Sequence, residues 1–302
     1  MGGNSWNSSD WSSFSSKTRS QSTSQTFSQN SMHPDLDPRG VRLRESRDSA
    51  AHPNSHAVIV APDVTASMGK LSEALVRTGV GVLVEELLKR RPVADPHVMC
   101  MGVGDAWARD RAPLQVTQFE ADIKIAQQLS QIWLEGGGGG NGGESYHLAW
   151  YFAAMHTSID CFEKRKKKGY LFTVGDENPH KVLSREQVKR VFGDDIERDL
   201  TSAELLTMAS RSYHVFHLLV EESYSCDASV HKNWKDLLGE RAIPLSDHTK
   251  LAELIVSTIQ VNEGASVADV MKSWSGDTSV VVARGLGGLA PTTTPGRGMV
   301  RF

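Results

Sequence analysis

Residues 57–70 read AVIVAPDVTASMGK, an apolar run of strand length followed by three oxygen-bearing side chains at alternate positions. These side chains belong to Asp63, Thr65 and Ser67, and a helical period begins directly after them. A buried strand that passes through a polar turn into a helix is the repeating unit of a parallel α/β sheet. The stretch therefore predicts a fold class, and it also raises the question of what three neighbouring oxygens bind.

The alternation of strands and helices continues along the chain. Further strand-like apolar runs lie at 97–103, 170–174, 213–220 and 242–245. Helical periods lie at 68–90, 123–134, 144–157 and 249–260. Residues 114–119 read as one more short strand, an antiparallel hairpin partner. The pattern predicts an α/β fold with a doubly wound, mostly parallel sheet, helices on both faces and one antiparallel edge strand.

The two ends of the chain differ in composition from its centre. Residues 1–32 are rich in Ser, with Asn, Gln and Thr, and bury too little apolar surface to offset the entropy of ordering, so we predict a disordered arm. Residues 33–55 are polar and contain proline, which is typical of a lead-in segment. We assign 56–284 to a single α/β domain and 285–302, which is rich in glycine, to a flexible tail.

Composition narrows the classes of partner. The net charge of the 302-residue chain is −3, so no general affinity for nucleic acid is expected. No apolar run approaches the roughly 18 to 20 residues that a membrane-spanning helix needs, and no secretory signal is visible. The three cysteines lie far apart and form no metal-binding pair. We therefore expect a cytoplasmic protein with neither a nucleic-acid nor a membrane partner.

Polar side chains follow several of the predicted strands, at the edge where a doubly wound sheet binds ligands. Asp176 follows the strand at 170–174 and adds a second carboxylate to the oxygens of Asp63, Thr65 and Ser67. Mg²⁺ prefers six oxygen ligands, of which one or two are carboxylates. We predict a cation site for Mg²⁺, with Mn²⁺ or Ca²⁺ as alternatives. A plain helix cap is the competing interpretation of the first loop.

Other polar residues near this edge are less informative. Asp105 is either a turn residue, which we favour, or an acceptor that orients waters of the site. His180 follows Asp176 by four residues and is expected to be exposed. His214 and His217 are three apart on a strand, so they face opposite sides of the sheet and cannot share a metal.

Four segments resemble the von Willebrand factor type A (vWA) domain, in the order found in that family. VIVAPDVTASMG (58–69) resembles its first strand and D-x-S/T-x-S loop, the metal-ion-dependent adhesion site (MIDAS), and LFTVGDENPH (171–180) resembles a later strand with its Asp-bearing loop. EGGGGGNGGESYHLAWYFAA (135–154) is similar to the glycine-rich loop and helix of the intracellular bacterial and phage branch, and MGVGDAW (101–107) to its acidic turn. The resemblance covers about 56–261 and implies a Rossmann-like vWA fold.

The resemblance also implies a ligand set for the cation. The ligands carried over from the family are Asp63, Thr65, Ser67 and Asp176, the last of them directly or through a water. The family usually adds a Thr from the glycine-rich loop, and here that loop has none. Asn141 or Glu144 stands in that region, and both remain open as the replacement. An open sixth position on the ion is filled, in the family, by an Asp or Glu of a protein partner.

The predicted function is therefore a metal-ion-dependent protein-binding module in an assembly or regulatory role, with no catalytic residue. The resemblance implies partners such as an AAA+ ATPase. A metal-free scaffold of the same fold is the alternative. A Mg²⁺-dependent phosphohydrolase that uses Asp63 as its nucleophile is disfavoured, because Thr65 stands where that chemistry needs a second carboxylate. No Walker loop or G-x-S-x-G motif supports another enzyme class.

Overall fold

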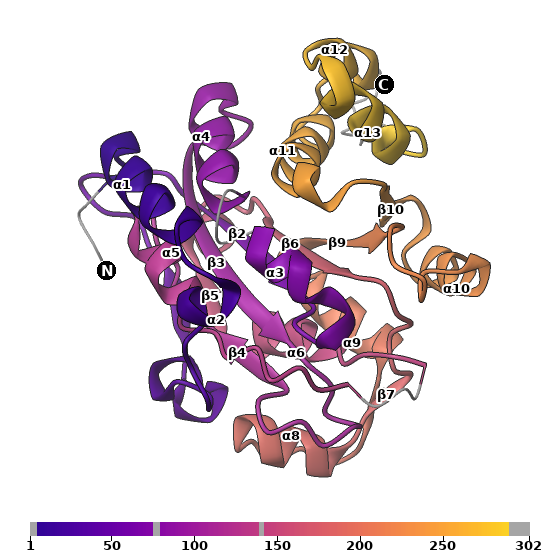
Figure 1. Cartoon of the computed structure of the whole chain (residues 1–302). Helices are drawn as coiled ribbons and strands as arrows, with labels where there is room; N and C mark the ends of the chain where they lie inside the picture. The colour runs from indigo at the N-terminus through magenta and orange to yellow at the C-terminus, as the bar shows by residue number, and fades with distance from the viewer. Residues whose placement is uncertain (1–4, 75–78, 139–141, 290–302) are drawn as a thin grey trace, which may run out of the picture.

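The computed structural model describes residues 5–74, 79–138 and 142–289, and its centre is a six-stranded sheet (Figure 1). The strand order is β10-β9-β6-β2-β3-β4. The strands are β2 (Ser55–Pro62), β3 (Asp95–Val103), β4 (Leu114–Val116), β6 (Gly169–Gly175), β9 (Tyr213–Val220) and β10 (Ala242–Leu245). Neighbouring strands are parallel except for the edge pair β3 and β4, which is antiparallel. The predicted α/β class with one antiparallel edge strand is confirmed.

The apolar runs of the sequence bury both faces of this sheet. Along β2, Val58 and Val60 point into one hydrophobic core, whereas Ala57 and Ile59 point into the other. Side chains of successive strand residues lie on opposite faces, so a strand that is covered on both sides must be apolar at every position. This requirement explains why the central strands read as continuous apolar runs.

Helices cover each face of the sheet, as predicted. One core contains side chains of α3 (Gly69–Ala74), α4 (Val80–Arg90), α5 (Lys124–Leu129), α11 (Leu251–Asn262), α12 (Val267–Lys272) and α13 (Gly276–Leu286). The other core contains side chains of α6 (His147–Met155), α7 (Asp160–Glu163), α8 (Arg185–Phe192), α9 (Ser202–Ala209) and α10 (Ala228–Leu238). Two small pairs of strands are β1 (Arg44–Ser46) with β5 (Thr157–Ile159), and β7 (Val182–Leu183) with β8 (Leu200–Thr201). No helix in the described ranges is long and apolar enough to cross a membrane.

Helical structure is described at both ends of the predicted helix at 68–90. A 3₁₀ turn, Ala66–Met68, leads into α3, and α4 begins only at Val80. Residues 75–78 between them lie outside the described part of the chain.

The serine-rich arm differs from the predicted disorder over most of its length. Helix α1 (Ser8–Arg19) is capped by Asn7, whose side chain accepts a hydrogen bond from Ser9 N, and α2 (Thr23–Thr26) follows. The Trp11 side chain is only 7% exposed and packs over Gly81 of α4, where an added Cβ would lie 1.9 Å from the indole ring. Figure 1 shows α1 beside α4. A few aromatic side chains thus bury apolar surface against the domain, although the average composition of the arm is polar. Residues 1–4 lie outside the described ranges.

The predicted domain boundary at residue 284 falls inside a helix. Helix α13 continues to Leu286, which is fully buried, and residues 290–302 lie outside the described ranges. At Gly285 an added Cβ would lie 2.5 Å from Leu254 Cδ1, so this glycine permits close packing of α13 on α11. The predicted flexible tail therefore includes residues that belong to the core.

The order of the strands creates one position where the direction of winding reverses. From β2 the chain adds β3 and β4 on one side, and it then returns to add β6, β9 and β10 on the other side. Ligands of doubly wound sheets bind beyond the carboxyl ends of the strands at such a reversal. Here the reversal lies between β2 and β6, the two strands that Asp63 and Asp176 follow.

Candidate metal site

The reversal between β2 and β6 brings the two predicted aspartates to the same edge. Pro62 pairs with Val174 in the parallel register, and Asp63 N donates to Val174 O at 2.9 Å. Asp176 follows two residues after Val174, and both carboxylates are completely buried. The charge of Asp176 contributes to raising the pKa of Asp63. The structure therefore places these two predicted residues near each other.

Hydrogen bonds from two sides fix the carboxylate of Asp63. Its Oδ1 accepts from the backbone N of Thr65 at 2.7 Å, and its Oδ2 accepts from the hydroxyl of Tyr146 at 3.1 Å. Burial is the largest influence on the pKa of Asp63 and raises it, while the bonds from Thr65 and Tyr146 act in the opposite direction. The first loop is thus a tight turn whose acid is held in one orientation.

Asp176 has one oxygen that is bonded and one that is not. Its Oδ2 accepts a 2.5 Å hydrogen bond from the hydroxyl of Ser223, in the loop after β9. Its Oδ1 is buried and has no hydrogen-bond partner. A buried carboxylate oxygen without a partner costs free energy unless a proton or a cation satisfies it.

Glu144 reaches the same site from the segment before α6. Its backbone N donates to Asn178 O at 2.8 Å, its side chain is nearly buried, and its Oε2 has no partner. A Cβ at Gly138 would lie 3.2 Å from Glu144 Oε1 and 3.4 Å from Thr65 Cβ, so the glutamate, the glycine loop and the first loop meet. Burial first, and then the charge of Asp63, raises the pKa of Glu144.

Glu144 is therefore the predicted loop residue that the structure places at the site. The other predicted loop residue, Asn141, lies outside the described ranges. So does the side chain of Ser67, although its backbone forms part of the 3₁₀ turn Ala66–Met68. Thr65 is buried beside Asp63, as expected.

The site carries more negative charge than the protein balances. In the described part of the chain no ion pair involves Asp63, Glu144 or Asp176. Three buried carboxyl groups without a counter-charge must either hold protons or surround a cation. The two unpartnered oxygens and the hydroxyl-bearing loop are hard oxygen donors of the kind that Mg²⁺, Mn²⁺ and Ca²⁺ prefer, so the residues present fit such an ion.

The carboxylate oxygens of Asp63, Glu144 and Asp176 do not all lie within 4.8 Å of one another; among the described residues, such a group of ligand atoms is found elsewhere. One ligand atom from each of Glu222, Asp247 and His248 lies within 4.8 Å of the other two, in the loops after β9 and β10. Glu222 is exposed, and its Oε2 already accepts from the backbone N and faces the Nδ1 of His248 at 2.6 and 2.7 Å. These contacts account for the group without an ion.

Asp105 belongs to a hydrogen-bonded network beside the site. Its buried carboxylate accepts from Ser145 Oγ at 2.8 Å and from Trp107 N at 2.9 Å, and His180 Nε2 lies 2.8 Å from the same oxygen. Asp105 therefore joins the loop after β3, the segment before α6 and the loop after β6. It shapes the turn, as we favoured, and it also positions the neighbours of Glu144. The expectation that His180 is simply exposed is wrong, because its side chain is 14% exposed and bonded to Asp105.

The two histidines of β9 face opposite sides, as predicted. The ring of His217 stacks on Trp234 at 3.5 Å in the core beneath α10. His214 instead lies against Tyr170, whose side chain belongs to the opposite core. They do not form a joint metal site.

Two residues of the site were not predicted from the sequence. Tyr146 and Ser223 donate hydrogen bonds to Asp63 and Asp176, from positions 83 and 47 residues away along the chain. No spacing rule identifies such partners. The sequence shows a glycine, Gly175, directly before Asp176, and in the structure an added Cβ there would lie 1.9 Å from the Tyr146 hydroxyl.

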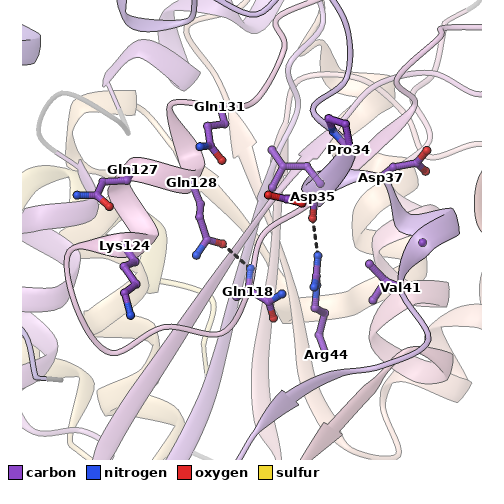
Figure 2. A pocket seen from close by; sticks show the side chains of 12 residues that line it. Pro34, Asp35, Asp37, Val41, Arg44, Gln118, Lys124, Gln127, Gln128 and Gln131 are labelled. Atoms are coloured by element: carbon purple, nitrogen blue, oxygen red, sulfur yellow. Dashed lines mark hydrogen bonds between the residues drawn. The ribbon is translucent and has the colours of Figure 1, made fainter. Parts of the chain in front are cut away.

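A hollow of about 510 Å³ lies away from these residues, between the lead-in segment and α5 (Figure 2). Its walls carry four glutamines, and Figure 2 shows two of its polar groups already in use. Gln128 Oε1 accepts from the backbone of Gln118, and Arg44 donates to the backbone oxygen of Asp35. This hollow is polar, but its charged groups do not converge on a point.

Comparison with known proteins does not identify a family. No protein-family model matches the chain, and no curated protein matches it. Among solved structures, the chain is similar to the pilus adhesin SpaC from Lactobacillus rhamnosus GG in its open conformation, with 10% identity and a TM-score of 0.49. The match covers 72% of this chain and 31% of the adhesin, so this chain spans less than a third of that protein's length. A similarity of this size gives no information about function.

Proposed function

We propose that this protein is a metal-ion-dependent protein-binding module of the vWA type. A divalent cation, Mg²⁺ in the first place, would be held at the switch point of the sheet by Asp63, Asp176 and Glu144, with hydroxyl groups of the first loop. The observation that carries the proposal is the pair of buried, unpartnered carboxylate oxygens, Asp176 Oδ1 and Glu144 Oε2, beside Asp63. A cation bound among the three carboxyl groups would offset their uncompensated charge.

The resemblance of the four sequence segments adds the second half of the proposal. In vWA domains with this motif an acidic residue of a partner completes the coordination of the ion. We extend this role to a partner that presents Asp or Glu, in an assembly or regulatory complex such as one with an AAA+ ATPase. The strand order and the two acidic strand ends are compatible with this assignment.

One observation favours the metal-free scaffold as a second candidate. The raised pKa values of Asp63 and Glu144 allow these acids to hold protons, which would remove much of the charge without an ion. A protonated site would then serve only to join the loops. The two candidates differ in whether metal stabilises the folded protein.

Thermal melts with and without Mg²⁺ or Mn²⁺ separate these candidates. At a concentration of about 100 times the dissociation constant, a bound ion adds about 2.7 kcal/mol to the free energy of unfolding, which raises Tm by roughly 5 °C or more. Asp63→Asn should abolish the shift. The control is Asp35→Asn, because the side chain of Asp35 is 86% exposed and distant from the site in sequence. Equal melting temperatures with and without metal in the wild type would contradict the metal site and favour the metal-free scaffold.

Enzyme assays on the same samples test the remaining class. Phosphatase or ATPase turnover that requires metal and disappears in Asp63→Asn would replace the binding function with catalysis. A pull-down with and without chelator then tests the metal-bridged contact directly.

A further inference from the structure

A groove of about 580 Å³ opens beside the candidate metal site. It lies between the loop after β6, the start of α9 and one side of α10. Its lining residues are Gly142, Gly143, Asn178, Pro179, His180, Lys181, Thr201, Ser202, Ala203, Asn233, Asp236 and Leu237. The groove and the metal site share a wall, because Glu144 N donates to Asn178 O and Glu144 pairs with Pro179 in a parallel bridge.

The charges of this groove favour an anionic occupant. Lys181 is exposed and has no ion-pair partner within the described ranges, whereas Asp236 is already paired with Lys232 at 2.5 Å. The amino-terminal end of α9, which contributes a partial positive charge, forms another part of the wall. Glu204 in its first turn is neutralised by Arg198 at 2.5 Å.

The polar groups of the groove favour a peptide as its occupant. A chain of amide contacts runs across it, from Gly142 O to Asn178 Nδ2 at 3.2 Å and from Asn178 Oδ1 to Asn233 Nδ2 at 2.9 Å. Amides in such a row can exchange hydrogen bonds with a peptide backbone. Trp107, which is 50% exposed, lies against the ring of His180 at 5.5 Å and adds an apolar surface for a neighbouring side chain.

We propose that this groove binds an extended acidic peptide segment of a partner protein. One carboxylate of the segment reaches the cation beside Glu144, and a second carboxylate of the same segment contacts Lys181. The inference rests on the proposed metal-dependent function. It adds to that function the class of partner and the surface that recognises this partner. Specificity for a pair of acids, rather than for one, follows from the position of Lys181 outside the metal site.

The test uses the full chain and a series of blocked, fluorescein-labelled peptides. Each peptide carries two aspartates separated by a different number of glycines, and each has a matched peptide with one Asp replaced by Asn. Fluorescence anisotropy in Mg²⁺ should detect tighter binding of one two-aspartate peptide than of its matched peptide. Lys181→Gln should weaken that binding about threefold, in the range of an exposed ion pair, while Lys189→Gln on α8 should have no effect.

A steric pair of variants keeps the proposal falsifiable. Ala203 and Thr207 are both exposed on α9, one turn apart, and only Ala203 lines the groove. Ala203→Trp should weaken binding by about tenfold or more, whereas Thr207→Trp should leave it unchanged. Equal binding by these two variants would overturn the groove proposal, as would the absence of binding by every peptide in the series.

The outcome for the groove is distinguishable from the outcome for the metal. If Mg²⁺ raises Tm in the wild type and in Ala203→Trp alike, the cation site exists whether or not the peptides bind. If binding is lost in Ala203→Trp but is unaffected by chelator and by Asp63→Asn, the groove binds the peptide without a cation, and both the carboxylate–cation contact and the proposed metal-dependent function are overturned.

Discussion

The hydroxyl group of Tyr146 donates a 3.1 Å hydrogen bond to Oδ2 of Asp63, and this bond connects the start of α6 to the end of β2. The tyrosine ring is completely buried and lies edge-on against the stacked rings of His217 and Trp234, with ring centroids 4.9 and 5.5 Å away. Tight packing leaves the hydroxyl one position. The orientation of the first candidate ligand is therefore set by the core beneath it.

Tyr146→Phe should weaken Mg²⁺ binding by about tenfold, because a partner that orients a metal ligand typically contributes a factor of this size. The ring remains in place, so the free energy of unfolding should fall by only about 1 kcal/mol for the lost hydrogen bond. Calorimetric titration with Mg²⁺ and urea denaturation measure the two effects.

Tyr151→Phe is the matched control for this change. Tyr151 lies on the same helix, and its hydroxyl donates a 2.7 Å hydrogen bond to Asp194, away from the site. The two substitutions should cost similar stability, but only Tyr146→Phe should change the affinity for Mg²⁺. An equal loss of affinity in both variants would show that Tyr146 does not position Asp63.

Gly175 is the residue that makes room for the Tyr146 hydroxyl. An added Cβ at this position would lie 1.9 Å from the hydroxyl oxygen and 2.6 Å from Cζ of the ring. Gly175→Ala should therefore lower the free energy of unfolding by about 3 kcal/mol through overpacking, as measured by urea denaturation followed by circular dichroism.

The double variant Gly175→Ala/Tyr146→Phe tests the cause of that loss. Removal of the oxygen relieves the shortest contact, so the double variant should be more stable than the sum of the single losses predicts, by about 1 kcal/mol. Complete additivity would place the strain elsewhere than at Tyr146.

The sheet and the first two acids of the site could be predicted because their signals are local. Continuous apolar runs such as 57–61 identify strands that are buried on both faces, and the residues that follow them lie at one edge of a parallel sheet. Asp63 and Asp176 were found by this rule. Helices α8 and α9 also had a local signal that we did not use, the capping boxes that begin at Ser184 and Thr201.

The remaining features depend on contacts between distant parts of the chain. Whether Asn141 or Glu144 faces the site depends on the path of a glycine-rich loop, whose backbone has many allowed conformations. Ser223 meets Asp176 only because β9 lies beside β6. The amino-terminal arm was predicted to be disordered from its average composition, whereas its structure depends on contacts between Trp6, just before α1, and Trp11 and Phe14, on α1.

His217 should make the folded protein less stable in acid. It is fully buried, and burial holds its pKa well below the usual value, so the unfolded chain takes up a proton that the folded chain does not. Above about pH 6.5, the ordinary pKa of a histidine in an unfolded chain, this proton uptake does not occur and the folded protein keeps its full stability. As the pH falls below that value, the free energy of unfolding falls. At pH 5 the loss from this one residue is about 2 kcal/mol.

His217→Phe tests the titration and largely keeps the packing. The new ring can stack on Trp234, but it loses the 2.9 Å contact with Thr173 Oγ1, at a cost of about 1 kcal/mol at every pH. The free energy of unfolding, measured from pH 7 to pH 5 with chelator present, should fall less steeply in the variant than in the wild type. Parallel curves for the two proteins would exclude His217 as a source of acid sensitivity.

Docking of the amino-terminal arm should depend on Trp11. This side chain is 7% exposed and covers Gly81 of α4, so Trp11→Ala removes most of the contact and leaves a hole. The free energy of unfolding should fall by about 3 kcal/mol, and trypsin should cleave faster after Lys17 and Arg19 in α1.

Trp107→Ala is the control for this change. Because Trp107 is 50% exposed, its replacement should lower the free energy of unfolding by less than about 1 kcal/mol, as is usual for surface substitutions. Rapid cleavage after Lys17 and Arg19 in the wild type, together with an unchanged stability of Trp11→Ala, would show that the arm does not pack against α4 in solution.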